Sequence, residues 1–358
     1  MTNLCTILGI ESSCDETAAA IVSSGRTIHS NVIASSAELH KRHGGVVPEI
    51  AARQHLDVIR PVIQQALSDA GCTLDDIDGI AATGGPGLIG GVLVGTMSAK
   101  ALAAARGLPY FAVNHLEGHA LTARLTDGLA FPYLLLLVSG GHTQLLCVNG
   151  LGDYTRYGTT MDDAAGEAFD KSASVLGLGY PGGPAIEKAA QHGQAHAVAL
   201  PRPRYNADDC HFSFSGLKTA VSDRWKENSE KNGAKGTSTT VADFAASLQS
   251  AIADCLVSRT ERAMQRFRKE TGSRQLVVAG GVAANQTVRS ALHNLAETNN
   301  FTLSTPPLSL CTDNGAMIAW VGCEHFQQNS ASPLNFAPKP RWPLDDKAPP
   351  PPGRGVRE

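Results

Sequence analysis

The chain has 358 residues, of which 42% are hydrophobic and 18% are charged, and its formal net charge is −3. A chain of this length is longer than one compact core usually requires, so we expect two domains. The small negative charge excludes a protein whose whole surface attracts nucleic acid, so any such binding must depend on local patches or on a partner.

The eight cysteines form no C-x-x-C pair, and several lie within apolar runs. We interpret them as reduced, mostly buried thiols of a cytoplasmic protein. The N-terminus lacks a charged region followed by a long apolar stretch, so no signal peptide is expected. The longest apolar run, residues 133–138, is too short to span a bilayer, which predicts no membrane association.

The first third of the chain predicts an alternation of strands and helices. A strand, a small polar turn and a second strand come first, at residues 6–10, 11–17 and 18–22. A helix, a third strand, a glycine-rich turn and a helix of small residues follow, at residues 51–70, 78–83, 84–91 and 92–105.

The same pattern returns in the second half of the chain. A strand, a polar turn and a strand are predicted at residues 131–138, 139–143 and 144–148. A strand, a glycine turn and a helix are predicted at residues 275–279, 280–285 and 287–296. We interpret the two halves as one α/β architecture used twice. Further helices are expected at residues 161–178, 185–191 and 241–268.

The domain boundaries follow from this repeat. We expect a first lobe at residues 1–112, completed by residues from about 300 to 330, and a second lobe at residues 113–299. The proline-rich tail, residues 331–358, is expected to be extended and flexible.

A strand that ends in a glycine turn and leads into a helix presents free backbone N–H groups to an anion. The turns at residues 84–85, 139–141 and 280–281 are of this kind. None has the spacing of a P-loop or of a dinucleotide-binding Rossmann motif, which argues against both of those classes. Several such turns in a duplicated pattern indicate a nucleotide bound in a cleft between two similar domains.

Two residues are candidates to bind the rest of a nucleotide. The carboxylate of Asp170 can accept hydrogen bonds from ribose hydroxyls, and the amide of Asn285 can bond to a base or a sugar. The alternatives for Asp170 are an ion pair with Lys171 or a charge on a helix surface, and the alternative for Asn285 is a helix cap.

A pair of histidines is the main candidate for a metal site. His115 and His119 lie one turn apart on the same side of a helix, and neutral imidazoles are good ligands for zinc or iron. Two ligands are too few for a tight site, and Asp313 is the best candidate for a third. The alternative is a surface histidine and a helix cap. Because Glu117 is not adjacent to His115, the zinc-protease motif H-E-x-x-H is absent.

Together these motifs resemble those of one known family, the bacterial-type tRNA N6-adenosine threonylcarbamoyltransferases, formerly described as O-sialoglycoprotein endopeptidases. The resemblance covers about residues 4–326. It rests on motifs at residues 9–17 (GIESSCDET), 43–49 (HGGVVPE), 115–119 (HLEGH), 138–143 (VSGGHT), 166–171 (GEAFDK), 179–184 (GYPGGP), 212–218 (FSFSGLK) and 280–285 (GGVAAN).

The resemblance implies a duplicated fold like that of actin, Hsp70 and sugar kinases (the ASKHA fold), with two lobes and a nucleotide cleft. It implies one divalent metal ion per chain, with Fe(2+) favoured and Zn(2+) as the alternative, bound by His115, His119 and Asp313. The implied adenylate-binding residues are Leu137, Val138, Ser139, Gly140, Gly141, Asp170, Gly183 and Asn285.

The implied activity is the transfer of a threonylcarbamoyl group from threonylcarbamoyl-adenylate to N6 of the adenine 3′ of the anticodon, in tRNAs that read codons beginning with A, with release of AMP. The implied partners are tRNA, a paralogous non-catalytic subunit and a small ATPase subunit. Asp15 and Glu16, in the first polar turn, are candidates to accept the amine proton or to orient the acceptor. The alternative is that they bond to backbone N–H groups of the turn.

Contacts with tRNA require basic residues, and the candidates are Lys41, Arg42, Arg202, Arg204 and the cluster at residues 259–274. The small-residue helix that contains Gly91 and Gly95 is a candidate face for a partner, with internal packing as the alternative. A small-molecule kinase of the same fold is the main competing function, although such kinases use magnesium rather than histidine-bound metal. A metalloprotease and an ATP-dependent chaperone are weaker alternatives.

Overall fold

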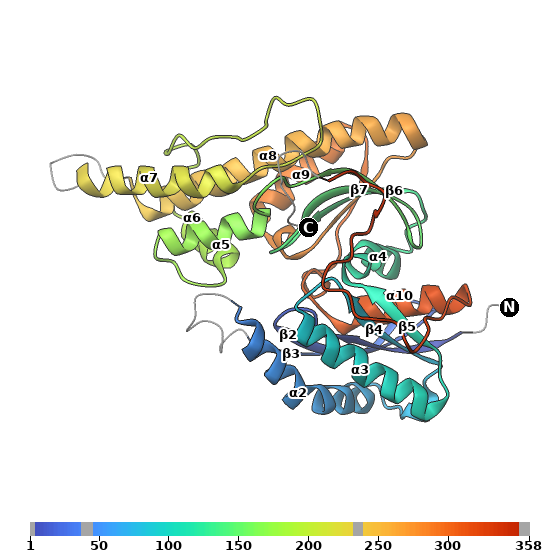
Figure 1. Cartoon of the computed structure of the whole chain (residues 1–358). Coiled ribbons are helices and arrows are strands. Elements are labelled where there is room, and N and C mark those ends of the chain that lie inside the picture. Colours follow the sequence, from blue (N-terminus) through green and yellow to red (C-terminus); the bar gives the residue numbers. More distant parts are fainter. Residues whose placement is uncertain (1–3, 37–45, 232–238, 351–358) are drawn as a thin grey trace. The chain divides into compact units, whose positions relative to one another are not determined.

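A computed structural model of the chain describes residues 4–36, 46–231 and 239–350 (Figure 1). The chain forms two compact units. The first comprises residues 1–130, 150–153 and 306–346, and the second comprises residues 131–149, 154–305 and 347–358. The main divisions therefore lie at residues 130 and 305, whereas the sequence led us to expect them at residue 112 and near residue 300.

The first unit contains a five-stranded mixed sheet in the order β3-β2-β1-β4-β5. The central strand β1 (Thr6–Glu11) pairs antiparallel with β2 (Glu16–Ser23) and parallel with β4 (Gly79–Gly85). The outer strands are β3 (Thr27–Ser35), antiparallel to β2, and β5 (Tyr110–Asn114), parallel to β4.

Both faces of β1 are covered by helices, because its side chains alternate between two packing layers. Leu8 and Ile10 belong to a hydrophobic core that includes residues of α2 (Pro48–Asp69) and α3 (Ile89–Arg106). On the other side of the strand, Gly9 lies so close to α10 (Gly315–Gln327) that a Cβ atom would overlap the backbone of Ala319. The remaining helices among the described residues of the unit are η1 (Leu74–Asp76), α4 (His115–Asp127) and η3 (Leu308–Leu310).

The second unit repeats the topology of the first. Its sheet has the order β10-β9-β6-β7-β8. Its central strand β6 (Tyr133–Val138) pairs antiparallel with β7 (Thr143–Gly150) and parallel with β9 (Gln275–Ala279). The outer strands are β8 (Asp153–Thr159) and β10 (Thr302–Ser304), the latter parallel to β9. Each strand of the second sheet thus has its counterpart in the first, which confirms the predicted duplicated α/β class.

The helices of the second unit are α5 (Ala165–Val175), α6 (Gly182–Ala190), α7 (Ser215–Lys231), α8 (Val241–Thr271), η2 (Gly281–Ala284) and α9 (Gln286–Thr298). Helix α8 begins with a capping box between Thr240 and Asp243 and ends at Gly272, whose φ of 73° favours glycine. By length and composition α8 is apolar enough to cross a membrane, but 56% of its apolar window is buried inside the unit, where Leu248 and Phe267 join the core.

The sequence did not reveal β3, β5, β8, β10, α7 or α10. Helix α7 extends to Lys231, and residues 232–238 lie outside the described part of the chain. Lys41 and Arg42, two of the predicted tRNA contacts, also lie outside it.

Residues 331–346 pack against the first unit, although no regular helix forms there. The N–H of Ser332 donates to the carbonyl of Tyr110 in the edge strand β5 (2.7 Å), and the N–H of Lys339 donates to the carbonyl of Gly84 (2.8 Å). Gly85, with a φ of 133°, touches Lys339 so closely that a Cβ atom would overlap its carbonyl. The segment therefore crosses the turn that follows β4.

The carboxylate of Asp162 organises the start of α7. Its Oδ1 accepts hydrogen bonds from the N–H groups of Phe214 (2.7 Å) and Ser215 (3.2 Å), and its Oδ2 accepts from the hydroxyls of Ser213 (2.5 Å) and Ser215 (2.9 Å). Burial acts to raise the pKa of Asp162, but these hydrogen bonds lower it below the usual value. A distant carboxylate thus satisfies donors at the N-terminus of this helix.

We predict that Asp162→Ala lowers the free energy of unfolding by about 1–3 kcal/mol, because it leaves several donors without their acceptor. Urea denaturation at neutral pH measures the change. A depressed pKa stabilises the fold above the unfolded value of about 3.9, so the difference between the two proteins should shrink below about pH 4. Asp208→Ala, at a fully exposed carboxylate, is the control and should change little. Equal stabilities of Asp162→Ala and the original protein would contradict this role.

Candidate functional site

The two histidines lie at the start of helix α4. Strand β5 ends at Asn114, whose Oδ1 caps the helix by accepting from the N–H of Leu116 (2.9 Å). His115 and His119 follow on one side of the helix, with their rings perpendicular and their centroids 4.9 Å apart. Both are buried, with exposed fractions of 9% and 1%. The alternative of a surface histidine is therefore wrong.

Asp313 joins this pair from a distant segment of the same unit. It precedes Asn314, which caps α10 by accepting from the N–H of Met317 (2.9 Å). Its Oδ1 lies 3.2 Å from Nε2 of His119 and 3.5 Å from Nε2 of His115. The ligand atoms of the three residues all lie within 4.8 Å of one another. The structure thus brings together the three residues that were predicted to bind metal.

A buried carboxylate orients the first imidazole. Nδ1 of His115 lies 3.0 Å from Oε2 of Glu11 and 3.1 Å from the hydroxyl of Ser13. Glu11 is fully buried and also accepts from the N–H of Ser13 (2.6 Å) and from the hydroxyl of Thr83. This arrangement leaves Nε2 of His115 facing Asp313, as in metal sites where the second ring nitrogen is held by a carboxylate. The roles of Glu11 and Ser13 were not predicted from the sequence, although an acidic residue at the end of an apolar strand was a usable signal.

Negative charge is concentrated around these ligands. Burial acts to lower the pKa of His115, but the carboxylates of Asp313 and Glu11 raise it to about 9. Burial acts to raise the pKa of Glu11, and His115 holds it below its usual range. Burial and the neighbouring carboxylates of Asp15 and Asp313 raise the pKa of Glu16 to about 9. A divalent cation would offset this mutual repulsion.

The residues present fit a metal ion. Two imidazole nitrogens and one carboxylate are a donor set typical of iron(II), and zinc accepts the same ligands. Nδ1 of His119 is buried and has no hydrogen-bond partner among the described residues, so this ring is held less firmly than that of His115.

We predict that Glu11→Gln weakens metal binding by about 10–100-fold, because the carboxylate that orients His115 is lost. Titration of the metal-free protein with Fe(2+) or Zn(2+), followed by metal analysis after dialysis, measures the change. Glu49→Gln replaces an exposed carboxylate of the same unit and is the matched control. Unchanged metal content of Glu11→Gln would contradict the orienting role.

In the second unit, the turn between β6 and β7 is open. The N–H of Ser139 donates to the carbonyl of His142 (2.8 Å), which closes the turn. Cβ atoms added to Gly140 and Gly141 would meet nothing within 4 Å. Leu137 and Val138 are fully buried in β6, so their side chains belong to the core.

The turn after β4 is different, and the prediction that it is a free anion site is wrong. The chain's own C-terminal segment fills it. The N–H of Gly87 donates to the carbonyl of Pro340 (3.2 Å), and the carbonyl of Gly84 accepts from Lys339.

Asp170 and Gly183 meet at the start of α6. Oδ1 of Asp170 accepts from the N–H of Gly182 (2.7 Å), and burial raises the pKa of this carboxyl. Lys171 pairs with Asp163 and Glu167 at 2.8 Å each, so the predicted alternative of an Asp170–Lys171 pair is wrong.

Asn285 caps α9. Its Oδ1 accepts from the N–H of Val288 (3.0 Å), as the helix-cap alternative predicted, and its Nδ2 lies 3.3 Å from Oε1 of Gln249. Two close approaches bring this region next to the open turn: Gly280 contacts the carbonyl of Val138, and Gly166 of α5 contacts Ser139. The two glycine turns of the second unit and the start of α5 therefore lie next to one another.

The basic residues suggested for tRNA are mostly occupied within the chain. Arg259 is 1% exposed and donates to the carbonyls of Ala207 (2.6 Å) and Asp209 (2.8 Å), so its proposed surface role is wrong. Four others form ion pairs: Arg202 with Asp254, Arg204 with Asp209, Arg262 with Asp208 and Arg266 with Glu270.

The glycines of α3 face the interior. Cβ atoms on Gly91 and Gly95 would overlap Ser12, so internal packing explains these two residues. The exposed apolar side chains on α2 and α3 are instead Leu56, Ile89, Leu93 and Met97.

The sequence matches the family model described as tRNA N6-adenosine threonylcarbamoyltransferase over residues 27–320. Curated proteins of that name from Brucella canis and Brucella ovis are each 55% identical to the chain, over 98% of both sequences. Among solved structures, full-length HypF in its phosphate- and nucleotide-bound form is 13% identical to the chain, with a TM-score of 0.57. The match covers 92% of this chain and 47% of that chain.

The activator of the 2-hydroxyisocaproyl-CoA dehydratase from Clostridium difficile, with bound ADPNP, is 14% identical, with a TM-score of 0.51 and 91% of this chain and 96% of that chain covered. At such low identity these two structures show the fold alone. They confirm the predicted fold class, the duplicated ASKHA type.

Proposed function

The chain belongs to the tRNA N6-adenosine threonylcarbamoyltransferase family, whose members are transferases that modify tRNA, and we propose that it uses threonylcarbamoyl-adenylate as the donor. In this proposal the acceptor is N6 of the adenine 3′ of the anticodon in tRNAs that read codons beginning with A, and AMP is released. The observation that carries the proposal is the convergence of His115, His119 and Asp313 in one unit of a chain with this family membership.

The chemistry explains why such a donor is needed. The lone pair of an exocyclic adenine amine is delocalised into the ring, so it attacks only an activated carbonyl. A mixed anhydride of a carbamic acid and a phosphate provides that activation, and its phosphate leaves with negative charge. Backbone N–H groups that point at this phosphate lower the barrier.

We assign adenylate binding to the second unit. The backbone of residues 137–141, together with Asp170, Gly183 and Asn285, is the proposed surface. It is supported by the open space at Gly140, Gly141 and Gly183, where added Cβ atoms would meet nothing within 4 Å. The Oδ1 atom of Asn285 already caps a helix, so we assign only its amide N–H₂ group to the nucleotide.

We assign one divalent ion, iron(II) in preference to zinc, to His115, His119 and Asp313. When bound, such an ion supplies Lewis-acid stabilisation for the charge that develops at the threonylcarbamoyl carbonyl. Glu11 and Ser13 hold the His115 ring in position. Asp15 and Glu16 are the residues proposed to accept the amine proton or to orient the acceptor.

We predict that His115→Ala loses bound metal and transfer activity together, each by about a hundredfold or more, since losing a ligand costs more than losing its orienting partner. Mass spectrometry of tRNA nucleosides, after incubation with threonylcarbamoyl-adenylate and with or without the partner subunits, measures the product N6-threonylcarbamoyladenosine.

His293→Ala is the control, because His293 is an exposed residue of α9 paired only with Glu297 among the described contacts, and it should keep both properties. Normal product formation by a His115→Ala protein shown to be free of metal would end the metal assignment. Failure of the original protein to form the nucleoside with any combination of subunits would end the proposed reaction.

Protein partners are also part of the proposal: a paralogous non-catalytic subunit and a small ATPase subunit, in the cytoplasm. The exposed apolar residues of α2 and α3 are the proposed face for the paralogue, because large apolar side chains gathered on one surface mark interaction sites. Because the net charge of the chain is −3 and four of the candidate arginines are already ion-paired, we expect tRNA binding to depend on these partners.

We predict that Met97→Glu weakens binding of the paralogous subunit by about thirtyfold or more, corresponding to ~2 kcal/mol, because a charge would be buried at an apolar contact. Size-exclusion chromatography with light scattering measures the complex, and the melting temperature of the isolated chain should stay unchanged. Leu334→Glu, at an exposed apolar residue elsewhere in the unit, is the control. Undiminished pairing by Met97→Glu would reject α3 as the interface.

A further inference from the structure

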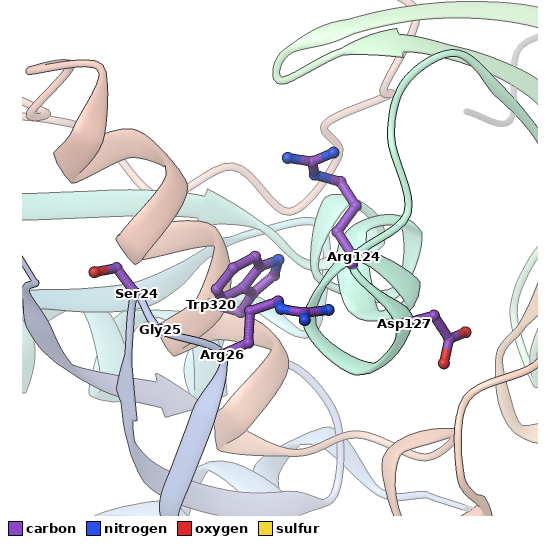
Figure 2. Close-up of a pocket in the computed structure, with 7 residues that line it drawn as sticks. Ser24, Gly25, Arg26, Arg124, Asp127 and Trp320 are labelled. Atoms are coloured by element: carbon purple, nitrogen blue, oxygen red, sulfur yellow. The ribbon is translucent and has the colours of Figure 1, made fainter. Parts of the chain in front are cut away.

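An open pocket of the first unit lies away from the candidate metal centre. It is formed by the β2–β3 turn, α10 and the C-terminal end of α4 (Figure 2), whereas His115 begins α4. Arg124 on its wall already donates to both carboxylate oxygens of Glu324 (2.7 and 3.2 Å). The pocket and the candidate metal centre are therefore separate features of the unit.

His55, on α2, is a buried polar residue that the proposed reaction has not yet used. Its exposed fraction is 1%, and the other buried residues of α2 are alanines, isoleucines and a valine. A polar side chain on such a face is tolerated only when it is hydrogen-bonded. Its ring also lies against α3, because a Cβ atom on Gly91 would be 2.8 Å from Nε2 of His55. Both helices therefore restrict the orientation of this ring.

Both ring nitrogens of His55 contact the β1–β2 turn, residues 12–17. Nε2 lies 3.1 Å from the carbonyl of Cys14, and Nδ1 lies 2.7 Å from the hydroxyl of Thr17. A carbonyl can only accept, so Nε2 carries the hydrogen, and a neutral ring then accepts the hydroxyl hydrogen of Thr17 at Nδ1. Cys14 and Thr17 flank the pair Asp15 and Glu16 in the sequence. One side chain thus holds both sides of the two carboxylates.

The same turn contacts the candidate metal centre. The hydroxyl of Ser13 lies 3.1 Å from Nδ1 of His115. The hydroxyl of Ser12 donates to the carbonyl of Gly91 in α3 (2.9 Å). The first residues of the turn are thus connected to α3 and to the metal centre, and His55 connects the residues that follow to α2.

We propose that His55 is a positioning residue for the transfer reaction and that it holds the β1–β2 turn, with Asp15 and Glu16, in place beside the candidate metal centre. His55 acts through the turn rather than on the reacting atoms. The inference rests on the proposed function, in which Asp15 and Glu16 accept the amine proton or orient the acceptor. Misplacing such a group by about 1 Å can lower a rate about a hundredfold, so a loosened turn should slow the reaction.

His55→Leu tests the proposal, because leucine suits the apolar face of α2 and forms neither hydrogen bond. We expect kcat for formation of N6-threonylcarbamoyladenosine to fall about tenfold or more, while the KM for threonylcarbamoyl-adenylate stays nearly unchanged. The hydroxyl of Ser36 still donates to the carbonyl of Asp15 (2.6 Å), so the fold should persist.

Hydrogen exchange, measured by mass spectrometry on the full chain, gives a readout that is independent of activity. In His55→Leu we expect exchange to become faster at residues 12–17. A general loss of stability would instead speed exchange throughout the unit, so the pattern separates a local positioning role from a structural one.

Conservative variants test the two contacts separately. The amide of an asparagine can take the place of Nδ1, and the amide of a glutamine can take the place of Nε2. His55→Asn and His55→Gln should therefore each give a higher kcat than His55→Leu. Thr17→Val should lower kcat by itself, and adding it to His55→Leu should have little further effect, because the two residues share one hydrogen bond.

His29→Leu, at an exposed histidine of β3, is the matched control and should leave turnover and exchange unchanged. Unchanged kcat, or unchanged exchange at residues 12–17, in His55→Leu would overturn the proposal. If that variant does not fold, the same results with Thr17→Val would overturn it. If the original protein forms no nucleoside with any combination of subunits, the proposed function fails instead, and hydrogen exchange still decides whether His55 holds the turn.

Discussion

The hydrogen bond between the Glu11 carboxylate and Nδ1 of His115 connects the sheet of the first unit to its candidate metal centre. Glu11 is the last residue of the central strand β1, and it also accepts from Thr83 of the neighbouring strand β4. A fully buried carboxylate is tolerated only when it is paired and its oxygens are hydrogen-bonded. One side chain therefore fixes the position of two strands and of the helix that carries both imidazoles.

The helices and strands that were predicted from the sequence are those in which local features, such as an apolar run or a helix cap, are enough to specify the structure. Strands β1 and β6 are short apolar runs, and α8 carries its capping box and its terminal glycine within its own sequence. The edge strand β3 is mostly exposed or half-buried, so it lacks such a signal and depends on its pairing with β2. The strand order, which reveals the duplication in full, depends on pairings between distant segments.

The same limit applies to the functional residues. The spacing of His115 and His119 is local and was readable, and Asp313 was a candidate for the third ligand that the resemblance to a family also implied. Glu11 and Ser13 were missed because their contact with His115 joins segments about a hundred residues apart. The glycine turns look alike in sequence, but Lys339 covers Gly84 and Gly85, whereas Gly140 and Gly141 face open space. The C-terminal segment around Lys339 therefore decides which glycine turn is open to a ligand. Local sequence patterns do not show that this segment covers the turn after β4.

The C-terminal segment at residues 332–342 also supports the candidate metal centre. Asn114 uses its Oδ1 to cap α4 and its Nδ2 to donate to the carbonyl of Trp342 (2.9 Å). The residue that fixes the start of the histidine-bearing helix is thus held by a part of the chain that lies beyond the sequence motifs that predicted the family. Lys100 adds a second link, because its ammonium donates to the carbonyl of Phe336. Residues 332–342 therefore belong to the structural support of the site, and the proline content that suggested a free tail reflects an extended path along β5 and α3.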